Sequence, residues 1–401
     1  MGCAWIKRSL DYERRAGAAR HLQYVTLQRF SDRQYSIQQS VATGGLVMDL
    51  LTPLFDDEKL HPHFKTISDG RQGRQFQRDE ILRWLEGFPD RDNKFVKEFQ
   101  TTFNSSFWEI YLYAVFREYG FSFDWTHAAP DFQLSGAGAE FIVEATTANH
   151  AADGTPEWGV SLTANFYDNI DFNALNRIAI IRLANSFMSK STKYLEKYAN
   201  HVHVKGRPFV LAVAPFEQPG FHLQTYRPIE ALLYDHYVDE AEYLASPERF
   251  PNGPRAKSLG SVEKDNGAEI ELGFFQSPRF RHISAVVFSH LATWGKVDAM
   301  CGNPGAFIRS IWSTPDGLKP RVCKASECTE TITDGLRVYH NPYATHPLPL
   351  DVLRKDGVVQ IWVDSDGHSL LQEQADRCLQ SRTAITLLTS NNDDIDDKAF
   401  C

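Results

Sequence analysis

The sequence has few cysteines and no long apolar run, and each shortage excludes a class of protein. Six cysteines in 401 residues are too few for a disulfide scaffold, so a reducing cytoplasm is the expected location. No stretch of about 18 apolar residues occurs, so we expect no membrane span. Residues 1–10 also lack the apolar segment of a secretory signal.

Positive charge is in deficit over the whole chain, which carries a formal net charge of −9. This balance argues against a protein that coats nucleic acid, although local charge decides where a polyanion docks. Residues 171–210 carry seven Lys and Arg side chains against two acids, a local excess of +5. The Walker loop, the Rossmann fingerprint and the Gly-x-Ser-x-Gly elbow are missing, so the sequence gives no support to an ATPase, a dehydrogenase or a serine hydrolase.

The length of the chain suits one large domain or two modest ones. We divide it into a mainly helical N-terminal region (1–100), an α/β core (101–215) and a C-terminal α+β extension packed on that core (216–401). The extension contains two strand-like apolar runs, Ile283–Phe288 and Val358–Val363. We expect these runs to extend the sheet of the core or to form a small accessory layer.

The pattern of residues 103–214 predicts a definite order of elements: a helix, three strands, a second helix and a further strand. The predicted bounds are Asn104–Tyr119, Phe121–Trp125, Pro130–Leu134, Glu140–Thr146, Asp171–Tyr198 and Pro208–Pro215. In the second helix the apolar positions Phe172, Leu175, Ile178, Ile181 and Leu183 recur at approximately helical spacing. The last strand, Pro208–Pro215, is apolar throughout and therefore reads as fully buried.

Two carboxylates fall on neighbouring strands of this core. The side-chain period of two places Asp131 on one face of its strand, and it makes Glu144 the acid in an otherwise apolar strand. Since adjacent strands lie about 5 Å apart, the two acids can approach each other. Two like charges so close are costly unless a cation or a shared proton relieves them, and a divalent metal with oxygen ligands does so.

A third carboxylate belongs to the same argument. Glu109 is the only charged residue in the stretch Phe107–Phe116, which reads as a helix buried nearly all round. An unpaired buried carboxylate is expensive, so Glu109 is expected either to point outward at a weak spot in the packing or to face a metal or a basic partner.

At this point the stretch FWEIYLYAVFREYGFSFDW…PDFQL…EFIVEAT resembles the core of the PD-(D/E)XK nucleases, the restriction-endonuclease-like superfamily. Pro130-Asp131 matches the proline and first acid of that motif, and Glu144 matches the second acid 13 positions later. Glu109 matches the additional metal-binding glutamate that many members carry on the first helix. The resemblance covers about 110 of the 401 residues and implies an α/β restriction-endonuclease-like core with α/β extensions.

One position departs from the family pattern. The lysine expected two residues after the second acid is replaced by Thr146. Three explanations compete: the lysine has moved to the second helix, as Lys190 or Lys193; Arg177 or Arg182 supplies the positive charge; or the core is inactive and only binds nucleic acid. We favour a move to Lys190.

The resemblance implies a Mg²⁺-dependent (or Mn²⁺-dependent) endonuclease, with DNA a more expected substrate than RNA and with a role in restriction or defence. Asp131, Glu144 and Lys190 would be catalytic, and Glu109, Asp131, Glu144 and the Ala145 carbonyl would hold the metal. The basic side chains Arg177, Arg182 and Lys193 would contact the phosphate backbone. Cleavage of both strands of a duplex would favour a homodimer.

Three alternatives stay open. The first is a catalytically inactive nuclease fold that binds nucleic acid or a protein partner. The second is an unrelated α/β domain with a structural acidic cluster, which predicts Asp131 and Glu144 on opposite faces or paired with arginines. A zinc site at the Cys323-x4-Cys328 pair, with Cys301, His340 and His346 elsewhere in the sequence, is a weaker alternative, because the spacing is loose and no second close pair exists.

Overall fold

The computed structural model describes residues 48–69, 74–151, 153–160, 170–251, 253–364, 370–373 and 377–386. The first 47 residues of the predicted N-terminal region therefore lie outside the described residues. The described part of that region is mainly helical. In the described part of the chain no helix combines the length and the apolar character needed to cross a membrane.

One large mixed sheet organises the protein, and its strands run in the order β1-β2-β3-β4-β9-β12-β13-β14. Their bounds are Ser122–Phe123 (β1), Phe132–Gly136 (β2), Ala139–Thr147 (β3), Phe209–Ala214 (β4), Ala285–Phe288 (β9), Arg337–His340 (β12), Val359–Val363 (β13) and Leu370–Glu373 (β14). β2 and β3 form an antiparallel hairpin, whereas β3, β4 and β9 run parallel. The two apolar runs of the C-terminal extension are therefore β9 and β13, and of the two expected arrangements they adopt the one that extends the sheet.

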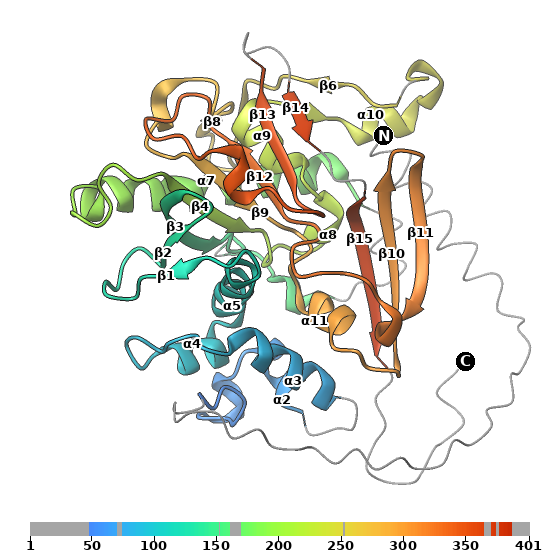
Figure 1. Cartoon of the computed structure of the whole chain (residues 1–401). Coiled ribbons are helices and arrows are strands. Elements are labelled where there is room, and N and C mark those ends of the chain that lie inside the picture. The colour runs from blue at the N-terminus through green and yellow to red at the C-terminus, as the bar shows by residue number, and fades with distance from the viewer. Residues whose placement is uncertain are drawn as a thin grey trace, which may run out of the picture.

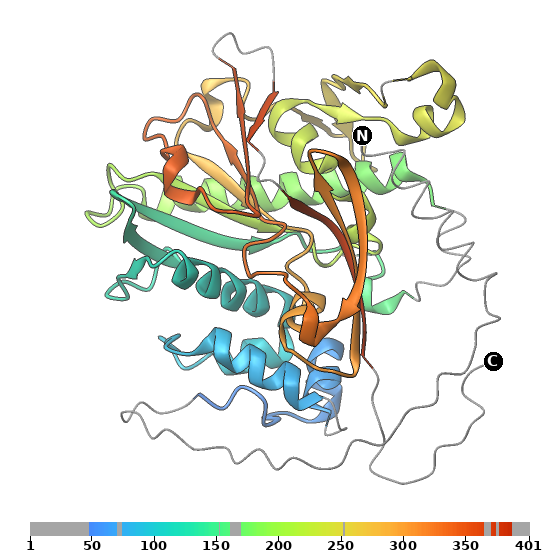
Figure 2. The same ribbon diagram turned by 45° about the vertical axis from the view of Figure 1, so that its right-hand side comes forward.

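Helices cover both faces of this sheet (Figures 1 and 2). On one face lie α2 (Pro62–Ser68), α3 (Arg74–Leu85), α4 (Phe95–Thr101), α5 (Phe103–Glu118) and α11 (Trp294–Met300), which share a core with the sheet. On the other face lie α7 (Phe172–Lys193) and α9 (Arg227–Tyr234), with α8 (Phe221–Gln224) and α10 (Glu240–Ala245) nearby. α7 continues into a short π-helix, η3 (Tyr194–Tyr198).

The remaining elements are further strands and short helical turns. The strands are β5 (Tyr237–Val238), β6 (Ala256–Lys257), β7 (Ser261–Glu263), β8 (Glu269–Glu271), β10 (Ala306–Thr314), β11 (Gly317–Lys324) and β15 (Cys378–Thr386). The helical turns are η1 (Asp57–Lys59), η2 (Glu157–Gly159), η4 (Pro247–Arg249), η5 (Pro278–Phe280), η6 (Ala325–Glu327) and η7 (Leu350–Leu353). β11, β10 and β15 form a separate antiparallel sheet beside α11 (Figure 1).

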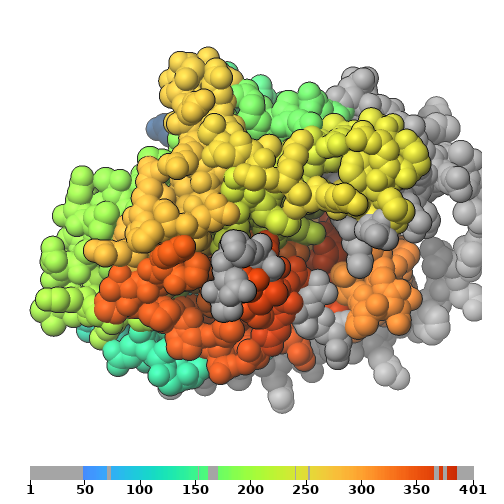
Figure 3. Space-filling view, turned by 90° about the horizontal axis from the view of Figure 1, so that it is seen from above, coloured from blue at the N-terminus to red at the C-terminus, as the bar shows by residue number. Residues whose placement is uncertain are grey.

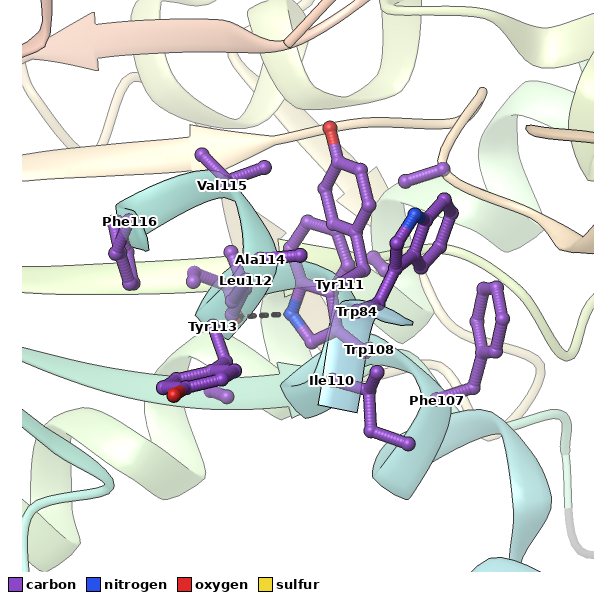
Figure 4. Close-up of a cluster of buried hydrophobic side chains, with 14 of the residues drawn as sticks. Trp84, Phe107, Trp108, Ile110, Tyr111, Leu112, Tyr113, Ala114, Val115 and Phe116 are labelled. Carbon is purple, nitrogen blue, oxygen red and sulfur yellow. Dashed lines mark hydrogen bonds between the residues drawn. The ribbon is translucent and has the colours of Figure 1, made fainter. Parts of the chain in front are cut away.

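α5 is the buried helix of the core, as its apolar sequence predicts. Trp108 and Tyr111 are fully buried and stack at 5.3 Å, and Trp84 of α3 packs against Tyr111 (Figure 4). The Trp108 Nε1–H donates to the Ala212 carbonyl at 3.1 Å, which ties α5 to the centre of β4. Large aromatic side chains bury much area and have few rotamers, so this helix is held in one position against the sheet.

The chain after residue 215 completes the sheet and covers part of the core. Figure 3 shows the face of the molecule on which the segments that follow α9 and those around β12 and β13 lie side by side. All six residues of β4 are buried, because α5 packs on one side of the sheet and α7 and α9 on the other. The order α5, β1, β2, β3, α7, β4 is the one predicted, and the protein is a mixed α/β fold.

Candidate active site

An open cleft of about 590 Å³ lies between α5 and α7 at one end of β3. Four acids and two bases line it: Glu98, Glu109, Asp131, Glu217, Arg182 and Lys190. Hydroxyl and amide side chains complete its wall, among them Ser105, Asn149, Asn185, Ser186 and Ser189. The cleft is therefore strongly polar, in contrast to the apolar core on either side of it.

The cleft exists because β3 is longer than its neighbour β2. β2 begins at Phe132, which pairs with Val143, so Asp131 stands opposite Glu144 just before the ladder starts. Beyond this point residues 145–147 of β3 pair only with β4. The freed Ala145 N–H donates to Asp131 Oδ2 at 2.7 Å, and this bond fixes the carboxylate at the open edge of the strand.

Glu144 is the fully buried acid of the site, and it is held by two lysines of α7. Lys190 Nζ and Lys193 Nζ donate to the same carboxylate oxygen, Glu144 Oε1, at 2.8 and 2.7 Å. Burial would raise the pKa of Glu144, but the two lysines lower it overall. Glu144 therefore stays ionised, and its partners are lysines rather than the arginines that a structural cluster predicts.

The charge state of Lys190 also depends on the other acids of the site. Burial favours its neutral form, but the negative charges of Glu144, Asp131 and Glu109 together raise its pKa above the ordinary lysine value. Lys190 is therefore a charged ammonium group in the wall of the cleft at neutral pH. Of the two lysines on Glu144, Lys190 lines the cleft, with 23% of its side chain exposed.

Glu109 and Asp131 are the two acids whose charge is poorly compensated. Burial, followed by the Asp131 charge, raises the pKa of Glu109 to about 8. Burial, followed by the Glu144 charge, raises the pKa of Asp131 to about 6. A further positive group in the cleft would relieve both shifts, and a divalent cation with oxygen ligands is such a group.

These shifts predict that the metal-free protein loses stability as the pH rises. The Glu109 carboxyl titrates near 4.5 in the unfolded chain and at about 8 in the fold, so the folded state holds an extra proton between these values. Stability conferred by that proton is present below pH 4.5 and is lost by about pH 8. We expect the stabilisation of the metal-free protein by Glu109→Gln to be about 2 kcal/mol greater at pH 8.5 than at pH 6.

Urea unfolding in EDTA at the two pH values measures this difference. Glu118→Gln is the matched control, because Glu118 lies on the same helix but is exposed and pairs with Lys355 at 3.0 Å. Adding Mg²⁺ at pH 8.5 is expected to stabilise the wild type more than Glu109→Gln. Equal stability of the wild type and Glu109→Gln at both pH values would contradict the assignment of an unrelieved charge to Glu109.

Backbone contacts position the loop that carries Asp131. The Arg91 guanidinium donates to the carbonyls of His127, Ala128 and Asp131, at 3.1, 3.3 and 3.2 Å. A ring nitrogen of His203 contacts the Ala129 carbonyl at 3.0 Å, and the His203 ring stacks on His127 at 3.7 Å. Arg91 was missed by the sequence analysis, since its partners are main-chain atoms that leave no pattern in the sequence.

The other predicted residues divide between the cleft and other surfaces. Arg182 lines the cleft, and its Nε–H donates to the Asn149 carbonyl at 2.6 Å. Arg177 does not line the cleft: it pairs with Asp265 at 2.6 Å and faces a different pocket beside β7. The structure thus brings Glu109, Asp131, Glu144, Lys190, Lys193 and Arg182 together, and it separates Arg177 from them.

Two further acids of the cleft were not expected from the sequence. Glu98 belongs to α4 and adds its negative charge to the surroundings of Glu109. Glu217 follows β4 and pairs with the ring of His150 at 3.1 Å. A polar row on α7 could have indicated the cleft: Arg182, Ser186 and Lys190 are spaced by four residues and therefore share one helix face.

The described residues contain no group of three His, Cys, Asp or Glu side chains already arranged around a metal position. This finding does not conflict with the expected cofactor, since Mg²⁺ commonly binds one or two carboxylates and keeps waters or substrate phosphates as its other ligands. Glu109 and Asp131 supply such a pair, and Ala145 lines the same cleft. Cys323 and Cys328 are free thiols, and His340 contacts Gln360 at 2.6 Å instead of joining them.

Comparison of the chain with protein-family models, with curated proteins and with solved structures found no match.

Proposed function

We propose that this protein is a metal-dependent nuclease that hydrolyses phosphodiester bonds at the cleft between α5 and α7. The observation that carries the proposal is the arrangement of charge in the cleft. Two acids with raised pKa values, Glu109 and Asp131, stand beside an ionised Glu144 that holds the ammonium group of Lys190. This arrangement and the order of the elements both resemble the PD-(D/E)XK nucleases.

The residues fit a Mg²⁺ or Mn²⁺ ion, for which Glu109 and Asp131 are the best-placed ligands. Such a cation, when bound, lowers the pKa of a water ligand and neutralises charge on the scissile phosphate. The Ala145 N–H keeps the Asp131 carboxylate at the edge of β3. Lys190 supplies a fixed positive charge for the pentavalent phosphate, because its raised pKa favours electrostatic stabilisation over proton abstraction.

The same residues account for a lysine that is missing from its usual place. Thr146 stands where the family has lysine, but α7 delivers Lys190 to Glu144 from the opposite wall of the cleft. The alternative function is an inactive nuclease fold that only binds nucleic acid or a partner. It rests on the absence of that lysine from its usual position. The contact between Lys190 and Glu144 favours the enzyme over this alternative.

Nucleic acid is the proposed substrate, with DNA ahead of RNA. The cleft is open to solvent, and Arg182 and Lys190 line its α7 wall. Because Glu98 and Glu217 add negative charge to the same cleft, a polyanion is expected to bind there well only when a divalent cation is also present.

Incubation of the full chain with plasmid DNA, single-stranded DNA and single-stranded RNA tests the proposal. Each substrate is offered with Mg²⁺, Mn²⁺ or EDTA, and the protein is compared with Glu144→Gln. Cutting of at least one substrate with metal, but not with EDTA or by the variant, is the expected result. Salt-dependent binding of nucleic acid without any cutting would favour the inactive-fold alternative, and neither cutting nor binding would refute both.

A further inference from the structure

A second cavity, of about 260 Å³, lies beside the cleft and is lined by residues of α5, η2, α11 and β15. The two sites share a wall. Asn104 lines the cavity, whereas the next residue, Ser105, lines the cleft. Phe216 and Glu217 divide in the same way, and the Glu157 N–H of the cavity wall donates to the Glu217 carbonyl at 3.0 Å.

Three buried side-chain donors on residues that line this cavity have no partner among the described residues, and the two ring nitrogens of His290, another lining residue, lack one as well. The three donors are Asn104 Nδ2, Trp294 Nε1 and Arg382 Nε. They belong to three different elements, α5, α11 and β15. Each unsatisfied buried donor costs about 1–3 kcal/mol, and native proteins contain few of them. Three around one cavity are typical of a binding site in which a ligand supplies the acceptors.

The charges around the cavity are matched by protein partners. The Arg382 guanidinium donates to Glu330 Oε1 at 2.5 Å, and Glu157 pairs with His63 at 2.9 Å. Burial, followed by the Arg337 charge, lowers the pKa of His290 to about 3, so this wall residue is neutral. A neutral ligand with acceptor atoms therefore fits better than an anion.

The apolar part of the wall is aromatic. Phe103 and Phe107 stack on each other at 5.5 Å, and both contact the ring of Trp294, at 6.3 and 5.9 Å. Phe216 and Phe221 pack together at 5.7 Å on the other part of the lining. Flat ring systems are the ligands that such walls favour, since they can stack on the aromatic faces. The cavity is also smaller than the pockets of about 300–1,000 Å³ that hold drug-sized molecules.

We propose that the cavity formed by Asn104, Trp294, Arg382 and the surrounding aromatic rings binds a nucleobase, a neutral planar heterocycle rich in hydrogen-bond acceptors. A base can come from a free nucleoside or from a strand that lies in the neighbouring cleft, extruded so that its edge meets the three donors. The second source rests on the proposed nuclease function, whereas the first does not.

Calorimetric titration of adenosine, guanosine, cytidine and uridine into the full chain, in EDTA, tests the first source. At least one nucleoside is expected to bind, and Asn104→Leu is expected to weaken that binding at least about tenfold, because it keeps the volume but removes the donor. Glu144→Gln is expected to bind the nucleoside as the wild type does, so this result is independent of cleavage.

A second variant tests the same cavity in case Asn104→Leu does not fold. A methyl group on Gly295 would lie 3.2 Å from Arg382 Nε, while the backbone of this α11 residue suits alanine. Gly295→Ala is therefore expected to cover one donor, to preserve the circular dichroism spectrum and to weaken binding of the same nucleoside.

An oligonucleotide that contains 2-aminopurine tests the second source, with Mg²⁺ present and in the Glu144→Gln background, so that the strand can bind in the cleft without being cut. A fluorescence change on binding that is lost in Asn104→Leu and in Gly295→Ala would assign the base to a strand, even if free nucleosides do not bind. The proposal is overturned if neither nucleosides nor the oligonucleotide respond to either variant, in which case water satisfies the donors. If the protein cuts no nucleic acid but binds bases in this way, the nuclease function is refuted, whereas the proposal of a base-binding cavity is supported.

Discussion

Replacing Asp131 by asparagine is expected to lower the rate of Mg²⁺-dependent cleavage by a factor of about 10³ or more. The amide oxygen of asparagine can still accept the Ala145 N–H that holds this side chain at 2.7 Å. The variant therefore keeps the local structure and loses the negative charge. Since Asp131 and Glu109 form the pair proposed to bind the cation, half of the ligand charge disappears with it.

Initial rates at a range of Mg²⁺ concentrations measure this effect. A weaker cation site shifts the half-saturating concentration upward, and saturating metal then recovers only part of the rate. Glu140→Gln is the matched control, because Glu140 also belongs to the β2–β3 hairpin but is exposed and pairs with Arg207 at 2.9 Å. Activity of Asp131→Asn within tenfold of the wild type would refute the role of Asp131, whatever the effect of the control.

The position of Asp131 relative to Glu144 was predictable because strand geometry is simple. The alternation of side chains placed both acids on one face, and the register Phe132↔Val143 sets them opposite each other. The bounds of α5 and β4 also agree with the sequence to within one residue, since β4 is a continuous apolar run between two prolines and α5 is a mainly apolar helix followed by Gly120. Local patterns of this kind depend on few neighbours.

The apolar stripe of α7 was predicted in part. Phe172, Ile181 and Leu183 of the expected stripe are buried, but Ile178 is 39% exposed. The buried face also includes Asn176, Ala179 and Ile180, and the helix packs on β4 and α9. Small and polar residues can lie in a helix interface when the partner surface is close, and the sequence of the helix does not reveal that surface.

The acids contributed by α4 and by the loop after β4 were not predictable. Glu98 and Glu217 reach the cleft only because α4 packs on α5 and because β4 ends beside β3. The residues that line the base cavity lie even farther apart in the sequence: 190 positions separate Asn104 from Trp294, and 88 separate Trp294 from Arg382. Long-range packing decides such sites, and a single sequence gives no direct signal of it.

Replacing Lys190 by methionine is expected to lower kcat by a factor of about 10² to 10³, while Lys193→Met lowers it by less than about tenfold. Both lysines donate to Glu144 Oε1, so either single variant leaves this buried carboxylate with one partner and the fold intact. The lysines differ in their surroundings. Lys190 lines the cleft and interacts with Glu109 and Asp131, whereas Lys193 Nζ lies 5.7 Å from the ring of Tyr198.

The pH dependence and the rescue by arginine separate an electrostatic role of Lys190 from a purely structural one. The pKa of Lys190 lies above its usual value, so the ammonium group is charged throughout the neutral range and cannot serve as a base there. Lys190→Arg keeps the charge and is expected to be at least tenfold more active than Lys190→Met. Its pH profile is expected to match that of the wild type. Equal losses in the Lys190 and Lys193 methionine variants, with no recovery by arginine, would instead show that the two lysines only hold Glu144 in place. A cleft in which neither variant changes the rate would have to obtain its positive charge elsewhere, and Arg182 on the same face of α7 would then be the residue to replace.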